Sequence, residues 1–151
     1  MRTGIRIGVD VGSVRIGIAR SDPSGTLAVP VTTVKRGKGD IEAVAELVEE
    51  YEALEVLVGL PLAMRGQKGP AANIATEFAR NLAQVVSPKA VKLVDERLTT
   101  VQAQQGLTQV GRSTRQSRSI VDQAAAVIIV QHVLDAEREN GVELGTTVGI
   151  E

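Results

Sequence analysis

The first part of the chain carries three short apolar segments separated by turn residues. Residues 5–11 (IRIGVDV), 14–22 (VRIGIARSD) and 27–34 (LAVPVTTV) are rich in valine and isoleucine, which favours β-strands. The connections are short, and DPSG at 22–25 is a strong turn signal. We therefore predict an antiparallel meander of three strands, with the strand that contains Pro30 at an edge.

From residue 40 onward the pattern changes to helices that alternate with strands. Apolar residues recur at helical spacing after Asp40, which can cap that helix, and again on one face of residues 74–82. Two nearly continuous apolar runs, EVLVGLP at 55–61 and AVKLVDE at 90–96, read as strands. Long apolar strands between helices imply a parallel half-sheet covered on both faces.

The last third begins with a short helix predicted from Thr99 or Thr100, followed by a polar, basic loop. A long helix is predicted from about Ser119 to Asn140, where Asn-Gly is a good stop signal. We expect one domain over residues 1–140 and a flexible tail at 141–151, which has no helical period.

Composition narrows the function classes. The chain has 151 residues, of which 43% are hydrophobic, as expected for one globular domain. It has no cysteine, which excludes disulfides, thiolate metal sites and cysteine nucleophiles. No apolar stretch approaches the roughly 20 residues of a membrane span, so we expect a cytoplasmic protein with no membrane partner. The net charge of −1 means that any surface for nucleic acid must be local.

The first candidate site residue is Asp10, an acid inside an apolar strand with glycines close on both sides. The carboxyl ends of parallel strands line the binding crevice of an open α/β sheet, which favours a functional role. The alternative is that Asp10 is an ordinary turn residue at the end of a strand.

Two further acids, Asp95 and Glu96, stand at the end of another apolar strand. Because side chains alternate along a strand, only one of them can face a given site. The alternative is a polar strand end that leads into a helix cap.

The fourth acid, Asp122, lies near the start of the last helix. Its neighbours at helical spacing, Ala125, Ala126, Ile129 and Val133, form an apolar stripe, so Asp122 shares a face that should be buried. A buried carboxylate is costly unless it is paired or binds a metal. The alternative is that Asp122 complements the helix dipole.

Two strand-end acids and one helix-borne acid can converge at one edge of such a sheet. Converging carboxylates repel one another, and hard divalent cations such as Mg²⁺, which prefer oxygen ligands, relieve that repulsion. Two such ions about 4 Å apart stabilise the attacking and leaving oxygens of a phosphodiester displacement. The acids therefore indicate a divalent-metal site that suits this kind of displacement.

At these residues the sequence resembles the YqgF/RuvX family, bacterial RNase H-like proteins related to Holliday-junction resolvases. The resemblance covers about residues 4–138 and is carried by four blocks in this order: GVDVGSVRIGIA, VGLPLAMRGQKGP, VDERLTT and VDQAAAVII. It implies an α/β fold with an RNase H-like mixed five-stranded sheet, ordered 3-2-1-4-5, in which strand 2 is antiparallel to the rest and helices cover both faces.

The resemblance also implies site residues. Asp10, Glu96 and Asp122 match the family's acids, with Mg²⁺ or Mn²⁺ as the cofactor; Asp95 is a further, less favoured ligand. The fifth strand is not adjacent to the first, so the longer Glu96 side chain would reach the site more easily than Asp95.

Five arginines are candidates for contact with nucleic acid: Arg15, Arg97, Arg112, Arg115 and Arg118. In this family Arg15 is expected to help neutralise phosphate, and Arg97 could contact phosphate or Glu96. The last three form a basic loop before Asp122, of the kind that contacts backbone phosphates without reading sequence. The alternative is a solvated loop.

The implied activity is endonucleolytic processing of the 5′ end of pre-16S rRNA, with structured RNA as the partner. Resolution of branched DNA is the first alternative, because the same metal chemistry cuts both; a homodimer is compatible with either. A second alternative is a non-catalytic assembly factor. A phosphotransferase related to actin and sugar kinases would need a duplicated core, and this chain has no internal repeat.

Overall fold

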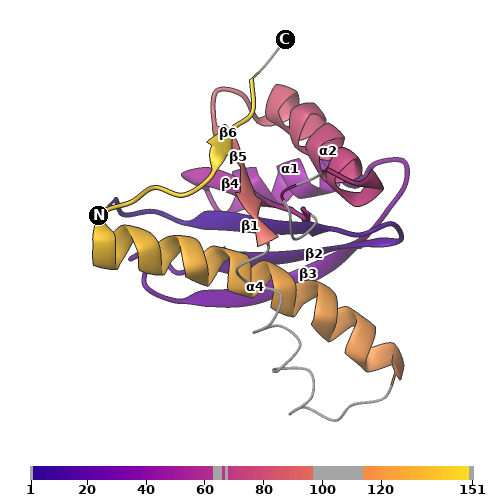
Figure 1. Cartoon of the computed structure of the whole chain (residues 1–151), viewed down its shortest axis with the longest axis horizontal. Coiled ribbons are helices and arrows are strands. Elements are labelled where there is room, and N and C mark those ends of the chain that lie inside the picture. Colours follow the sequence, from indigo (N-terminus) through magenta and orange to yellow (C-terminus); the bar gives the residue numbers. More distant parts are fainter. Residues whose placement is uncertain (1, 63–65, 67, 97–113, 150–151) are drawn as a thin grey trace.

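The computed structural model describes residues 2–62, 66, 68–96 and 114–149, with the backbone alone at 114–122. Its elements follow the order β1 (Arg6–Val11), β2 (Arg15–Ser21), β3 (Ala28–Lys35), α1 (Asp40–Glu50), β4 (Glu55–Leu60), α2 (Pro70–Val86), β5 (Ala90–Asp95), α4 (Thr114–Asn140) and β6 (Thr146–Thr147). They form one sheet between two helical layers, with α1 and α2 on one side and α4 on the other (Figure 1).

The sheet has the strand order β3-β2-β1-β4-β5-β6. Strands β1, β2 and β3 pair antiparallel as a meander, and β4 is parallel to both β1 and β5. The predicted meander, the edge position of the strand with Pro30 and the order 3-2-1-4-5 are therefore confirmed. The carboxyl ends of β1, β4 and β5 lie at the same edge of the sheet, which we call the acidic edge because Asp10, Asp95 and Glu96 lie there.

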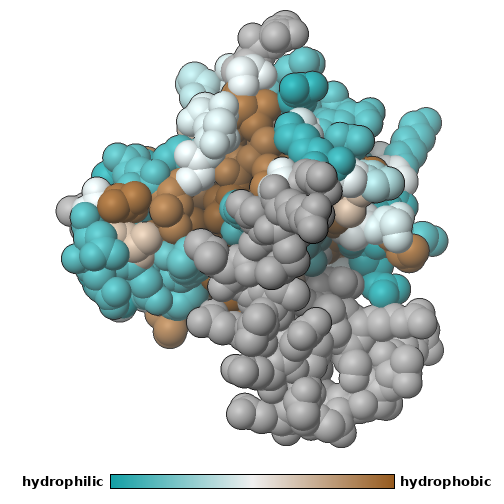
Figure 2. Space-filling view, in the orientation of Figure 1, coloured by the Kyte–Doolittle hydropathy of each residue, from teal (hydrophilic) through white to brown (hydrophobic). Residues whose placement is uncertain are grey.

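Two hydrophobic cores hold the layers together. Apolar side chains of the first core lie between the sheet and α1 and α2, including Val9, Val58 and Phe78. The second core lies under α4 and includes Leu57 and Ile129. In the view of Figure 2, apolar surface shows in the middle of this face, between α4 and the segment that carries β6. None of the helices in the described ranges is long and apolar enough to cross a membrane.

The approach of α4 to the sheet depends on a glycine in β1. A Cβ atom built on Gly8 would collide with the Val130 side chain and lie 3.0 Å from the carbonyl oxygen of Ala126. Only glycine fits this position without displacing the helix, so Gly8 fixes how closely α4 packs on β1. This contact also fixes which turn of α4 lies beside the acidic edge.

Four expectations need correction. The sheet has a sixth strand, because Thr146 and Thr147 in the tail pair antiparallel with β5. Helix α4 begins at Thr114, five residues before the predicted start. The N-cap of α1 is Gly39 rather than Asp40, whose carboxylate instead binds Arg36. Ile74, predicted on the buried face of α2, is 37% exposed.

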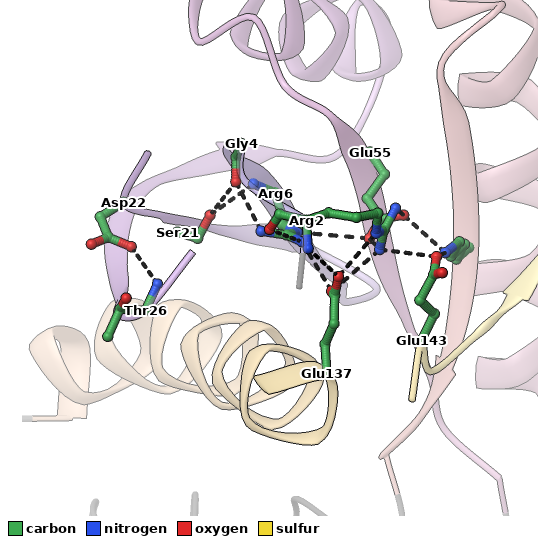
Figure 3. A network of polar contacts seen from close by, with 10 residues as sticks. Arg2, Gly4, Arg6, Ser21, Asp22, Thr26, Glu55, Glu137 and Glu143 are labelled. Atoms are coloured by element: carbon green, nitrogen blue, oxygen red, sulfur yellow. Dashed lines mark hydrogen bonds and ion pairs between the residues drawn. The ribbon is translucent and has the colours of Figure 1, made fainter. Parts of the chain in front are cut away.

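Buried ion pairs at the opposite edge of the sheet tie α4 to the strands (Figure 3). Arg6 in β1 is fully buried, and its Nη2 lies 2.9 Å from Oε2 of Glu137, which is 4% exposed on α4. Arg2 bridges Glu137 at 3.0 Å and Glu55 of β4 at 2.9 Å. Lys92 of β5 lies 2.9 Å from Glu55. These ion pairs join one helix to three strands, so they restrict sliding of α4 along the sheet.

The same ion pairs set the charge of Glu137. Burial alone would raise the pKa of this carboxyl, but hydrogen bonds from Arg2 and the positive charge of Arg6 outweigh it and lower the pKa to about 2. The hydrogen bonds to Glu137 and Glu55 raise the pKa of the Arg2 guanidinium despite its partial burial. Glu137 is therefore ionised throughout the ordinary pH range.

Candidate active site

Asp10 lies one residue before the end of β1, on the face of the sheet that α4 covers. Strand alternation determines the face: Val9 packs in the core under α1 and α2, whereas Gly8 contacts α4. Gly17 of β2 is the residue directly opposite Asp10 in the antiparallel pair. Gly17 therefore contributes no side chain beside the Asp10 carboxylate.

Glu96 follows β5 directly and its carboxyl group is hydrogen-bonded to the side chain of Asp10. The two residues come from strands that are not neighbours, since β4 lies between β1 and β5. Val94, two residues before Glu96, packs in the core under α4, whereas Leu93 packs on the other core. Alternation therefore places Asp95 on the face opposite to Glu96. The structure brings Asp10 and Glu96 together and directs Asp95 away.

The Glu96 side chain reaches Asp10 across Gly59 of β4. A Cβ atom built on Gly59 would lie 2.6 Å from Oε1 of Glu96 and 2.6 Å from Cδ1 of Ile129. Any side chain at position 59 would thus occupy the path of the Glu96 carboxyl group. Sequence analysis missed Gly59; its signal is the glycine near the end of an otherwise apolar strand, which often marks close approach of another group.

The contact changes the acidity of Glu96. Burial, the charge and hydrogen bond of Asp10 and, last, the charge of Asp95 raise the pKa of Glu96 to about 8. At neutral pH the Glu96 carboxyl is therefore largely protonated and donates a hydrogen bond to the Asp10 carboxylate. Two carboxyl groups that share one proton form a site where a cation can replace that proton.

The role of Gly59 predicts a large effect from one methyl group. We expect Gly59→Ala to displace the Glu96 carboxyl group and to lower the rate of cleavage about 10²-fold, the usual loss for a catalytic group misplaced by about 1 Å. The matched control is Gly149→Ala, because a Cβ atom at Gly149 meets no atom within 4 Å. Equal activity of the two variants would show that Gly59 does not position Glu96.

Helix α4 brings position 122 toward the same edge. The helix runs antiparallel to β1, since Ala126 lies over Gly8 and Glu137 lies over Arg6. Residue 122 is one turn before Ala126 on the same helix face, in the direction of Asp10. The side chain of Asp122 lies outside the described residues, so its part in the site stays a prediction. In the described part of the chain no group of three or more potential metal-ligating residues occurs.

The structure describes the five candidate phosphate-binding arginines to different extents. Arg15 begins β2 and shares the face of Gly17 and Asp10, two residues nearer the acidic edge. Arg115 and Arg118 belong to α4 rather than to a loop, which corrects that expectation. Their side chains lie outside the described residues, as do Arg97 and Arg112 entirely. Of the five, Arg15 is the one whose side chain belongs to the described residues.

A further arginine, which sequence analysis did not single out, holds the turn between β1 and β2. Arg36 donates from Nη1 to the carbonyl oxygen of Gly12 at 3.1 Å and from Nε to Asp40 at 3.0 Å. Its guanidinium carbon lies 5.8 Å from the centre of the Phe78 ring. These contacts fix the turn whose two strands carry Asp10 and Arg15. The available signal was the i,i+4 spacing of Arg36 and Asp40 across a helix start.

Comparison with known proteins agrees with this arrangement. The model of the family RuvX, described as "Holliday junction resolvase", matches residues 4–136. The chain belongs to the RuvX family. It is 54% identical over 153 residues to a protein of a Nocardioides species, with 98% of each chain covered, and 49% identical over 155 residues to one of Thermobifida fusca. Both RuvX relatives carry the name "Putative pre-16S rRNA nuclease".

Among solved structures, the RuvX chain resembles the RuvC protein of Thermus thermophilus in complex with Holliday junction substrate. The TM-score is 0.57 at 16% identity, and the match covers 95% of this chain and 99% of that one. A second structure, of Thermus thermophilus RuvC, gives the same TM-score. At this identity the likeness shows the fold, and it confirms the predicted RNase H-like α/β class.

Proposed function

We propose that this RuvX protein is a metal-dependent endonuclease that hydrolyses phosphodiester bonds in precursor 16S rRNA. The observation that carries the proposal is the contact between Asp10 and Glu96 at the acidic edge of an RNase H-like sheet. Two half-buried acids in contact reduce stability, and such a cost is typical of residues kept for function. The names of the RuvX relatives point to pre-16S rRNA as the substrate.

The donor set fits a hard divalent cation. Asp10 and Glu96 offer carboxylate oxygens, which Mg²⁺ and Mn²⁺ prefer, and no cysteine exists in the chain to favour a softer metal. Asp10, Glu96 and Asp122 would hold the ions. Such ions, when bound, would supply Lewis-acid chemistry toward the phosphoryl group and toward water.

The protein's own residues have separate roles in this scheme. On cation binding, Glu96 would release to solvent the proton that it shares with Asp10, and both carboxylates would then be available as ligands. Gly59 leaves room for the Glu96 side chain. Arg15 neutralises a phosphate next to the scissile bond, a contact that positions the strand without reading its sequence.

The test of the function uses two substrates in parallel. Purified protein is incubated with precursor 16S rRNA and with a four-way DNA junction, each with Mg²⁺, with Mn²⁺ and with a chelator. We expect cation-dependent cleavage of the RNA. Preferential cleavage of the junction would instead support resolvase activity, the second candidate, which the description of the RuvX family favours. No cleavage of either substrate would contradict the nuclease assignment.

The geometry of β5 predicts a sharp contrast between adjacent acids. We expect Glu96→Gln to reduce cleavage by about 10²-fold or more, because it removes a charge that contacts the reacting groups. Asp95→Asn should reduce cleavage less than about threefold, since Asp95 faces the other side of the sheet and acts only through its distant charge. The measurement is the cleavage rate of both variants at saturating Mg²⁺. A larger loss in Asp95→Asn than in Glu96→Gln would contradict the assignment of these two residues to opposite faces of the sheet.

A further inference from the structure

Helices α1 and α2 form a groove on the face of the molecule opposite α4. It has a volume of about 500 Å³, which is within the range of ligand-binding clefts. Its floor is apolar, with Val48 buried and Val85 53% exposed to solvent. The groove is lined by Glu42, Ala45, Glu46, Val48, Glu49, Glu52, Val85, Val86 and Lys89. We call it the α1–α2 groove.

The α1–α2 groove and Asp10 lie on opposite faces of the sheet, because Asp10 is on the face that α4 covers. Helix α1 ends at Glu50, five residues before the start of β4, and α2 ends at Val86, four residues before the start of β5. Both helices therefore end where these strands begin, at the edge opposite Asp10. Figure 1 shows α1 and α2 side by side on this face of the sheet. A ligand in the groove would leave the candidate active site open.

The rim of the groove is strongly acidic, with four glutamates among its lining residues. Within the described ranges, none of its four glutamates takes part in an ion pair. Glu42, Glu46 and Glu49 follow at helical spacing along α1. Lys89, the one cation among the lining residues described, directs its Nζ to the carbonyl oxygen of Ala53 at 2.7 Å.

This charge pattern is unfavourable in the isolated chain. Like charges at i,i+4 destabilise a helix, and glutamates near a helix C-terminus oppose the helix dipole. Neither α1 nor α2 has a basic residue in its last turn. The negative potential repels polynucleotides and attracts cations, while the exposed floor around Val85 favours an apolar side chain.

We propose that the α1–α2 groove binds a lysine- or arginine-rich segment of another protein that carries one or two apolar anchor residues. The anchors fill the floor between Val48 and Val85, and the basic residues pair with the glutamates of the rim. Because the groove is separate from the acidic edge, this partner and a nucleic acid can bind the same molecule together.

The test uses a synthetic 12-residue peptide of lysine and leucine with a fluorescent label. We expect saturable binding, and methyl NMR shifts confined to Ala45, Val48, Val85 and Val86. The double variant Glu46→Gln/Glu49→Gln should raise the Kd about tenfold, equivalent to about 1.4 kcal/mol. The matched control is Glu50→Gln/Glu139→Gln, which removes the same charge from exposed glutamates outside the groove and should change the Kd less than twofold.

A second peptide, with alanine in place of leucine, tests the apolar floor and should bind about tenfold more weakly. Equal weakening by the groove and control variants would overturn the proposal, because binding would then depend on net charge alone. NMR shifts outside the groove would also overturn it. Concentration-dependent self-association that the groove variants abolish would show that the occupant is a second copy of this chain. Melting temperatures confirm that every variant is folded.

Discussion

Replacing Asp10 with asparagine is expected to reduce cleavage by at least about 10³-fold while the fold is kept. The substitution preserves the size of the side chain and removes the charge that holds the cation, whose contribution to transition-state stabilisation is several kcal/mol. The measurement is single-turnover cleavage of precursor 16S rRNA at saturating Mg²⁺. Asp95→Asn is the matched control, because it removes a carboxylate at the same edge from the opposite face. Activity of Asp10→Asn within tenfold of the wild type would contradict the site.

The same variant should be more stable than the wild type in the absence of cations. The pKa of Glu96 is raised from 4.5 to about 8 in the folded chain, so the folded state binds more protons than the unfolded state between these values. The free energy of unfolding therefore falls as pH rises from about 4.5 through 8. Of the two neighbouring negative charges, Asp10 raises the pKa of Glu96 more than Asp95 does. Asparagine at position 10 removes that charge and should make the pH dependence of stability shallower. Urea unfolding with chelator at pH 5 and pH 8 measures the difference, and an unchanged slope would contradict the coupling.

The second large effect concerns stability and lies at the other edge of the sheet. We expect Glu137→Gln to lower the free energy of unfolding by about 3–5 kcal/mol, because it leaves the buried Arg6 and its neighbour Arg2 without their shared carboxylate. Glu139→Gln, two residues further along α4 and exposed, is the control and should change stability by less than about 0.5 kcal/mol. Urea unfolding at pH 7 measures both.

The pH dependence provides an independent check on Glu137. Its pKa is lowered to about 2 in the folded chain, so its ion pairs stabilise the wild type fully above about pH 4.5 and are lost as pH falls through 2. The difference in stability between the wild type and Glu137→Gln should therefore shrink across that range. A loss of less than 1 kcal/mol at pH 7, or a difference that does not change with pH, would show that the ion pairs are not stabilising.

The parts of the fold that were predicted correctly are those that local patterns determine. The strands around Val9, Val58 and Val91 are buried on both faces, and such strands leave long apolar runs in the sequence. The order of the strands came from the resemblance to a family. Strand β6 was missed because two threonines in a tail acquire strand structure only by pairing with β5. The start of α4 was missed because its first turns are polar and show no apolar period.

In the candidate site, too, some features could be predicted from the sequence and others depend on the tertiary fold. Strand alternation left the choice between Asp95 and Glu96 open. The resemblance to the family and the length of the side chain favoured Glu96, and the structure places Glu96 against Asp10. The sequence did not reveal that Gly59 makes this contact possible. The Glu96 side chain passes over β4 to reach β1, and this path is visible only when the three strands are placed side by side. Arg6 and Glu55 were not singled out in the sequence, and only the tertiary fold shows that they belong to one group of ion pairs.

The most direct test of the account is to count the protons released when Mn²⁺ binds. Glu96 carries a proton at pH 7 that must leave before both carboxylates can act as ligands. Calorimetric titration with Mn²⁺ in two buffers of different ionisation enthalpy gives this number. We predict release of nearly one proton per site at pH 7, a value that falls toward zero by pH 9, and strongly weakened binding in Glu96→Gln. Absence of Mn²⁺ binding to the wild type, or equal binding and proton release in Glu96→Gln, would contradict a metal site built on Asp10 and Glu96.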